Sequence, residues 1–168
     1  TAICIAAIGI IYFYSAAHVD EEIKTRARSY FNSIVITGKW NTNYGGVYAE
    51  KKPGVFSNPY IKSPDIKSTN GKTYTIKNTS VMTIEISGIA EKEGLFTYKL
   101  RSLRPLNPSS TSDLFETVSL AAFEHGQKEN FDKIYEGGNI KYRYIAPLYI
   151  TEECMKCHEN QDYKIGDV

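Results

Sequence analysis

The sequence predicts an α+β domain with a small antiparallel sheet, preceded by a long N-terminal helix that continues from a membrane anchor. Three observations support this prediction. Residues 2–19 contain no Asp, Glu, Lys or Arg. Residues 20–36 place apolar side chains at helical spacing. From residue 70 onward, short strand-like runs alternate with capped helical segments between turn signals.

The uncharged stretch 2–19 has nearly the length that a helix needs to cross the hydrocarbon core of a bilayer, about 20 residues. Aromatic residues 12–14 would form a belt at one interface. A signal peptide cleaved near residues 15–17 is the rival interpretation, and a buried helix of a soluble protein is the third. We therefore predict a partial transmembrane anchor at 1–19, in the inner membrane, and a periplasmic domain at 20–168.

Residues 20–36 are expected to continue the same helix, because no Pro or Gly stands between residues 16 and 36. One apolar stripe runs along this segment, formed by Ile23, Ala27, Tyr30, Phe31 and Ile34. Such a continuous rod is suited to link a domain outside the cytoplasm with one inside. Residues 37–72 are rich in turn signals and are expected to form a long loop.

The next segment predicts a hairpin turn at Asn70-Gly71, a strand at 72–77 and then a helix. One of residues 78–80 would cap this helix, and Gly94 would end it. Its inward-facing side chains are expected to be Val81, Ile84, Ile89 and Ala90. This order, a turn and a strand followed by a helix, is typical of a small α+β domain.

The remaining elements follow from local patterns. Residues 95–103 alternate apolar and polar side chains and predict a strand. Asp113 with Glu116 resembles a capping box and opens a helix. Residues 131–136 and 140–150 predict two antiparallel strands joined by a Gly-Gly turn.

Near the C-terminus, residues 154–158 read C-M-K-C-H, the C-x-x-C-H attachment signature of c-type haem. They lie on a short helix that is expected to be capped by Thr151. Two thiols on one helical turn can add to the two vinyl groups on one edge of a porphyrin, and the histidine can bind the iron as proximal ligand. The motif therefore predicts one covalently bound haem c, held by Cys154, Cys157 and His158.

Other uses of these cysteines fit the sequence less well. A zinc site needs four ligands, but the only further cysteine is Cys4 in the apolar stretch, and His18 and His125 lack ligand spacing. A redox dithiol is usually found in a βαβ frame, which this pattern lacks. A disulfide across two residues would stabilise little. An exported domain also favours haem, because cytochrome c is assembled outside the cytoplasm.

Several groups are candidates for the second axial ligand of the iron. Met82 is the leading candidate for iron and cofactor binding, because it is the one methionine outside the attachment motif. A thioether ligand favours ferrous iron and raises the reduction potential. His125, water, an open position or an unexpected group are the alternatives. Both side chains also have structural interpretations. Met82 could fill a gap in the core, and the helix dipole could favour His125 at the C-terminus of its helix.

Several longer segments form a combination of motifs that is more specific than C-x-x-C-H alone. They are ARSYFNSIVITGKWNTNYGGVYAE (27–50), SNPYIK (57–62), TYTIKNTSVMTIEIS (73–87), LRSLRPLNP (100–108), AAFEHG (121–126), YRYIAPLYITEECMKCH (142–158) and YKIGDV (163–168). Over residues 27–168 this combination resembles the single c-haem, PAS-like periplasmic sensor domains of bacterial histidine kinases, diguanylate cyclases and chemoreceptors. It also resembles stand-alone cyanobacterial c-haem cytochromes of the same fold. Gly38-Lys39 and Ile84 stand where this family usually carries arginine.

The resemblance implies a PAS-like sensor that detects redox state or a small gaseous ligand at the haem iron. It further implies signalling through the membrane helix to a cytoplasmic transmitter module in the same polypeptide, because the family continues past the position of Val168. A homodimer through the N-terminal helix fits this picture. The alternative function is electron transfer by a membrane-anchored monohaem c-type cytochrome.

Two further classes of function are disfavoured. An enzyme such as a haem peroxidase would need a distal His paired with Arg, and the sequence offers no such pair, so we expect no catalytic residues. A nucleic-acid partner is not expected either, because the net charge is +1 and no basic stripe is present.

Overall fold

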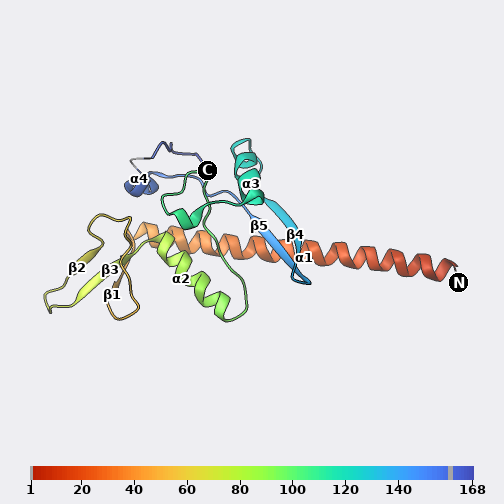
Figure 1. The fold of residues 1–168 in the computed structure, drawn as a ribbon, viewed down its shortest axis with the longest axis horizontal. Helices are drawn as coiled ribbons and strands as arrows, with labels where there is room; N and C mark the ends of the chain where they lie inside the picture. Colours follow the sequence, from red (N-terminus) through yellow and green to blue (C-terminus); the bar gives the residue numbers. More distant parts are fainter. Residues whose placement is uncertain (1, 159–160) are drawn as a thin grey trace.

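The structure, a computed structural model, describes residues 2–158 and 161–168, without the side chains of Lys156 and Cys157. Its fold is α+β, as predicted, with a long N-terminal helix followed by small antiparallel sheets (Figure 1). The elements are α1 (Ala2–Asn43), β1 (Val47–Glu50), β2 (Asp65–Lys67), β3 (Thr73–Lys77), α2 (Thr79–Lys92), the 3-10 turn η1 (Pro108–Ser110), α3 (Leu114–Glu124), β4 (Asn130–Glu136), β5 (Asn139–Ile145) and α4 (Glu152–His158). Figure 1 shows that the elements after α1 gather along the half of this helix nearer its C-terminal end.

Helix α1 is continuous from the apolar stretch into the charged segment, which confirms the predicted rod. At about 1.5 Å per residue, its 42 residues span about 63 Å. An 18-residue window of this helix has a mean hydropathy of 1.9, and none of that window is buried. The helix is therefore long and apolar enough to cross a membrane, as an anchor or as a signal sequence, and it is not a buried core helix.

The loop predicted at 37–72 is wrong for 37–43, which are the last turns of α1. It is also wrong for β1 and β2, which lie in this stretch and pair with β3. Gly38 lets α1 approach α2, since a Cβ at this position would lie 2.8 Å from Thr79 Cγ2. The Thr79 hydroxyl donates to Gly38 O at 3.1 Å, and the buried Asn41 amide donates to Lys77 O at 3.0 Å. These tertiary contacts outweigh the low helix propensity of the Gly- and Asn-containing segment.

The described strands form two separate antiparallel sheets, one with the order β1-β3-β2 and one made of the β4–β5 hairpin. The predicted turn before β3 is present, with Gly71 at φ 83°, where glycine is not strained. The β4–β5 hairpin pairs from Asn130 opposite Ile145 to Glu136 opposite Asn139. Its second strand ends at Ile145 rather than at residue 150, because Pro147 has no N–H to extend the pairing.

Helix α2 begins and ends where the sequence predicts. The Asn78 side chain caps it by accepting a hydrogen bond from Val81 N at 3.2 Å. Its inward face is more polar than predicted, because Thr83 and Ser87 are buried together with Ala90. The prediction that Ile84 and Ile89 face inward is wrong, since they are 53% and 64% exposed.

The strand predicted at 95–103 is also wrong, because no regular strand forms there. Ser87 of α2 takes the place of a partner strand. Its hydroxyl accepts a hydrogen bond from Tyr98 N at 2.8 Å and donates one to Tyr98 O at 2.9 Å. The backbone of this segment is thus paired with a helix side chain instead of with a sheet.

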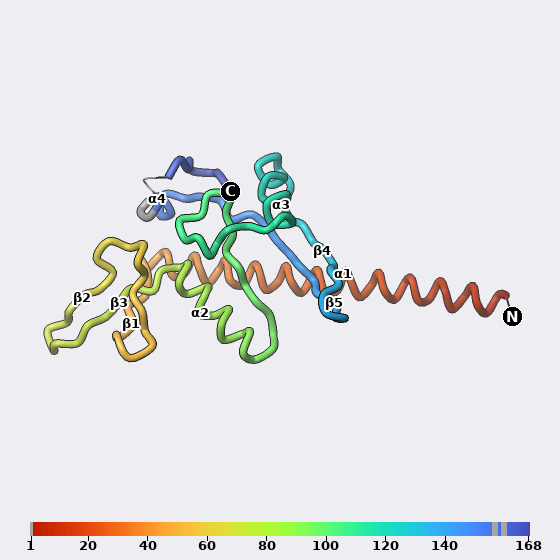
Figure 2. Tube along the Cα trace, in the orientation of Figure 1, coloured from red at the N-terminus to blue at the C-terminus, as the bar shows by residue number. Residues whose placement is uncertain are grey.

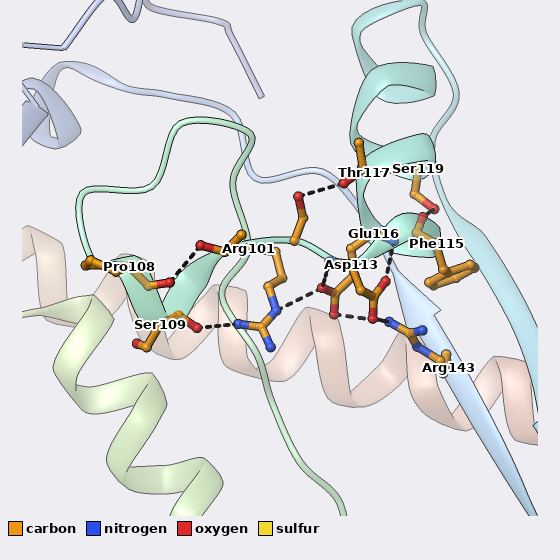
Figure 3. Close-up of polar contacts among 11 residues, drawn as sticks. Arg101, Pro108, Ser109, Asp113, Phe115, Glu116, Thr117, Ser119 and Arg143 are labelled. Atoms are coloured by element: carbon orange, nitrogen blue, oxygen red, sulfur yellow. Dashed lines mark hydrogen bonds and ion pairs between the residues drawn. The ribbon is translucent and has the colours of Figure 1, made fainter. Parts of the chain in front are cut away.

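Helix α3 opens with the capping box that the sequence predicts. Glu116 N donates to Asp113 Oδ1, and Asp113 N donates to Glu116 Oε2, both at 2.9 Å. Glu116 is only 6% exposed, and two arginines approach its carboxylate (Figure 3). Arg101 Nε lies 3.0 Å from Oε2 and Arg143 Nη2 lies 3.1 Å from Oε1. This carboxylate therefore joins α3 to the preceding loop and to β5.

We expect Glu116→Gln to lower the free energy of unfolding by about 2–3 kcal/mol. The amide keeps the size of the side chain but leaves Arg101 without this counterion and Arg143 paired with Asp113 alone. Breaking a buried ion pair costs about 3–5 kcal/mol, and the partial exposure of the two arginines, 19% and 25%, reduces this cost. Urea unfolding of the chain in detergent measures the change. Glu124→Gln, exposed at the other end of α3, is the control and should change stability by less than about 0.5 kcal/mol. Equal stability of the two variants would contradict this role.

Candidate haem-attachment site

Helix α4 carries the C-M-K-C-H motif and begins directly after Thr151, as predicted. Glu152 and Glu153 occupy its first turn, where negative charge favours a helix N-terminus. The Thr151 hydroxyl donates to Glu153 Oε2 at 2.9 Å and lies 3.4 Å from Cys154 Sγ. Contacts between neighbouring residues thus fix the start of α4 beside the first thiol.

The C-terminal residues return to the start of α4 and close a loop around it. Ile150 N donates to Asp167 O at 2.8 Å, and Gly166 N donates to Ile150 O at 2.9 Å. Figure 2 shows this end of the chain beside the loop that precedes α3. Arg104 of that loop binds it, donating to Asp162 O and lying 3.6 Å from Asp167 Oδ2. The motif is therefore held in a closed loop and not in a free tail.

His158 ends α4 and is contacted by two side chains of the C-terminal residues 161–168, which we call the closing segment. Its Nδ1 is hydrogen-bonded to Gln161 Oε1. The Tyr163 ring lies perpendicular to the imidazole, with 5.6 Å between the ring centroids. Tyr163 is only 7% exposed, and the Arg104 guanidinium lies 4.3 Å from its ring centroid. Because Nδ1 is occupied, Nε2 is the imidazole nitrogen that can bind an iron.

These residues fit a c-type haem. Cys154 is a free, partly buried thiol on the same short helix as His158. Cys157 is placed on α4 by its backbone, and its side chain lies outside the described residues. A porphyrin supplies four nitrogens to its iron, so the chain needs to provide axial ligands only. In the part of the chain that the structure describes, no group of three or more His, Cys, Asp or Glu side chains could hold a metal ion alone.

The two candidates for the distal ligand lie on other elements. Met82 is half-buried in the first turn of α2, and its N–H donates to Asn78 O at 2.9 Å. His125 is the exposed C-cap residue of α3. The ring and hydrogen-bond contacts described for His158 are with Gln161 and Tyr163, not with these two. The structure thus brings Cys154 and His158 together, whereas ligation by Met82 or His125 stays a prediction.

Sequence analysis missed three residues of this site, which are Arg104, Gln161 and Tyr163. No periodicity or spacing connects residue 104 with residues that follow it by more than fifty positions. The position of Gln161, three residues after the histidine of the motif, is the one local signal that could have been used.

A comparison with protein families assigns the chain to a known group. The sequence model of the Tll0287-like family, described as Tll0287, matches residues 15–166. The chain belongs to the Tll0287-like family. This family is cyanobacterial and related to c-type haem proteins, which supports the predicted haem association. The match to the Tll0287-like family includes α4 and most of the closing segment. No curated protein and no solved structure matches the chain.

We expect the chain to carry haem that remains attached after denaturation, when it is produced in a host with a cytochrome c assembly system. The pyridine haemochrome spectrum should be that of two thioether links. Replacing both motif cysteines (Cys154→Ser with Cys157→Ser) should give a colourless protein. Cys4→Ser is the matched control and should keep the haem, because Cys4 lies exposed on α1. Haem that extracts from the unsubstituted chain into acid-acetone would contradict covalent attachment.

Proposed function

We propose that this chain is a haem c sensor domain. In this proposal one haem is attached through Cys154, Cys157 and His158, and its iron responds to redox state or to a small gaseous ligand. Helix α1 passes the response through the inner membrane to a transmitter module of the same polypeptide. The domain from residue 20 onward faces the periplasm and acts as a binding module, not as an enzyme. The path of the chain from α4 to α1 is the observation that carries this proposal.

Strand β5 forms this path. Through residues 146–151 it leads directly into α4. Two of its tyrosines bind acidic groups, one on α1 and one that is paired with Arg28 of α1. Tyr142 OH donates to Asp20 Oδ1 at 2.9 Å, and Tyr144 OH donates to Glu129 Oε2 at 2.8 Å. The strand that ends near the haem-binding helix is therefore hydrogen-bonded next to the membrane-proximal part of α1.

Glu129 makes the strongest contacts between α1 and the segment that leads into β4. Arg28 donates to both of its carboxylate oxygens, from Nε at 2.8 Å and from Nη2 at 2.6 Å, and Lys24 Nζ lies 3.3 Å away. The bidentate arginine, joined by Tyr144 and Lys24, lowers the pKa of Glu129 to about 2. Because this pKa is depressed below its ordinary value of 4.5, the stability it contributes is complete above that pH and is lost as the pH falls toward 2.

A second ion pair lies closer to the N-terminus of α1, about one helical turn before Lys24 and two before Arg28. Lys133 of β4 donates to Asp20 Oδ1 at 3.0 Å, and this bond, followed by that from Tyr142, lowers the pKa of Asp20. We call the whole set the hairpin clamp, and it consists of Asp20, Lys24, Arg28, Glu129, Lys133, Tyr142 and Tyr144. Its members come from α1, from β4 and β5 and from the segment before β4. A shift of β5 would therefore stretch or break these hydrogen bonds and ion pairs.

The hairpin clamp supports sensing for a mechanical reason. Strand β5 is paired with β4 along its whole length, so a displacement that begins at α4 moves the hairpin as a unit. Helix α1 is uninterrupted, so a change at residues 20–28 is passed to the apolar segment that precedes them. A contact set of this kind can have two arrangements that a signal biases. Electron transfer alone would not require this connection.

Hydrogen–deuterium exchange in the ferric, ferrous and ferrous carbon monoxide forms tests the proposal. We expect the exchange of residues 20–28 and of β4–β5 to differ between these forms. Glu129→Gln should raise exchange there in every form and reduce the difference between them, because the bidentate contact with Arg28 is weakened. Glu136→Gln removes an exposed ion pair with Lys141 near the far end of the hairpin and should preserve the difference. Identical exchange in all three forms would contradict sensing and favour electron transfer.

We expect Met82→Leu to abolish a thioether-to-iron absorption band near the red end of the ferric spectrum and to lower the reduction potential. Leucine keeps the volume of methionine, so packing alone should cost less than about 1.5 kcal/mol. Met155→Leu is the matched control, because Met155 lies inside the attachment motif and cannot reach the distal side. An unchanged spectrum and potential in Met82→Leu would contradict ligation by Met82 and make His125 the next side chain to replace.

A further inference from the structure

Gln161 connects His158 to a fixed point of the backbone. Its Nε2 donates to Arg104 O at 3.0 Å, and its Oε1 is hydrogen-bonded to His158 Nδ1. Its own backbone N–H donates to His158 O at 2.9 Å, which ties Gln161 to the end of α4. Arg104 O also accepts a hydrogen bond from Tyr163 OH at 3.2 Å. One backbone carbonyl therefore anchors both side chains that contact the imidazole.

These hydrogen bonds determine which nitrogen of His158 carries the proton. A backbone carbonyl can only accept, so the amide NH₂ of Gln161 must face Arg104. The amide oxygen of Gln161 must then face His158. Because this oxygen can only accept, the proton of the neutral imidazole is on Nδ1. The lone pair of Nε2 is consequently available for a metal.

The orientation of the imidazole ring is fixed as well. The buried Tyr163 ring meets it at 90°, and the Tyr163 hydroxyl is hydrogen-bonded to Ser102. The Arg104 guanidinium packs on Tyr163, with 4.3 Å to the ring centroid, so the tyrosine is held by the same loop that holds Gln161. The imidazole thus has both a hydrogen bond and an edge-to-face ring contact to define its plane.

We infer that Gln161 is the positioning residue that sets the tautomer and the donor strength of His158. Histidines that bind metals commonly donate their other N–H to a carboxylate, a backbone carbonyl or a water, which orients the ring and makes it a stronger donor. Here a side-chain amide supplies that acceptor. The inference rests on the proposed attachment of haem through His158. A stronger proximal donor stabilises ferric iron relative to ferrous iron, so Gln161 lowers the reduction potential of the bound haem.

Two substitutions in the full haem-bound chain separate this role from simple anchoring. Gln161→Leu removes the acceptor for Nδ1 and the bond to Arg104 O. Gln161→Glu also loses the bond to Arg104 O, but it offers Nδ1 a stronger, charged acceptor. If the acceptor acts on His158, the potential measured by spectroelectrochemical titration rises in Gln161→Leu and falls below that of the unsubstituted chain in Gln161→Glu. If Gln161 only anchors the loop, both variants shift the potential in the same direction.

The other glutamine provides the control. Gln127→Leu removes an exposed side chain that donates to Glu129 O, and it should leave the potential unchanged. A pyridine haemochrome assay of the unsubstituted chain comes first, because absence of haem there overturns the proposed function and this inference with it. Shifts of equal sign, or no shift in either haem-bound variant, overturn the inference alone. If Gln161→Leu loses its haem, the Gln161→Glu potential decides, with a fall supporting the inference and a rise or no change overturning it.

Discussion

The carboxylate of Glu116 holds together the two segments that support the candidate haem-attachment site. It is almost inaccessible to water, and a buried charge is stable only when it is paired and hydrogen-bonded. Asp113 N donates one hydrogen bond to it, and the guanidinium groups of Arg101 and Arg143 supply the charge. Arg143 is held further by Asp113 Oδ2 at 2.6 Å and by the ring of Phe115, 4.5 Å away. The start of α3 is thereby a rigid junction between the loop that contains Arg101 and strand β5, which contains Arg143.

Both of these segments lead to His158. On one side, Arg101 fixes the loop that contains Arg104, and it does so also by donating to Ser109 O at 2.8 Å. Arg104 O then anchors Gln161 and Tyr163, the two residues in contact with the imidazole. On the other side, Arg143 belongs to β5, which continues into α4. The histidine of the motif is therefore reached from Glu116 by two routes, and the loss of that one charge removes an ion pair from each.

The parts of the fold that sequence predicts correctly are those whose signals are local. The capping box of Asp113 and Glu116, the Asn78 cap and the Asn70-Gly71 turn each depend on residues within four positions of one another. The errors arise where distant contacts decide. Residues 37–43 are helical because Gly38 packs on Thr79, and residues 95–103 are not a strand because Ser87 binds their backbone. The same reason explains the site, since the motif cysteines and His158 are local, whereas Arg104 meets Gln161 only in the folded chain.

The contacts on the two faces of β5 differ in kind, and this difference favours movement on the face toward α1. Tyr142 and Tyr144 reach the hairpin clamp, whereas Arg143 between them reaches Glu116 of α3. On the side of α3 and the C-terminal segment the supporting groups are Glu116, 6% exposed, and Tyr163, 7% exposed, and displacing them would leave buried polar groups unpaired. In the hairpin clamp the ionic side chains are 23–41% exposed, so water can replace their partners and opening costs less free energy than displacing the buried groups. In the proposed sensor, a strain that starts at α4 is therefore relieved at the contacts between the hairpin and α1, beside the apolar segment. If α4 holds the proposed haem, a domain that is stiff around the motif and adjustable next to α1 transmits a change at the iron better than one with the opposite arrangement.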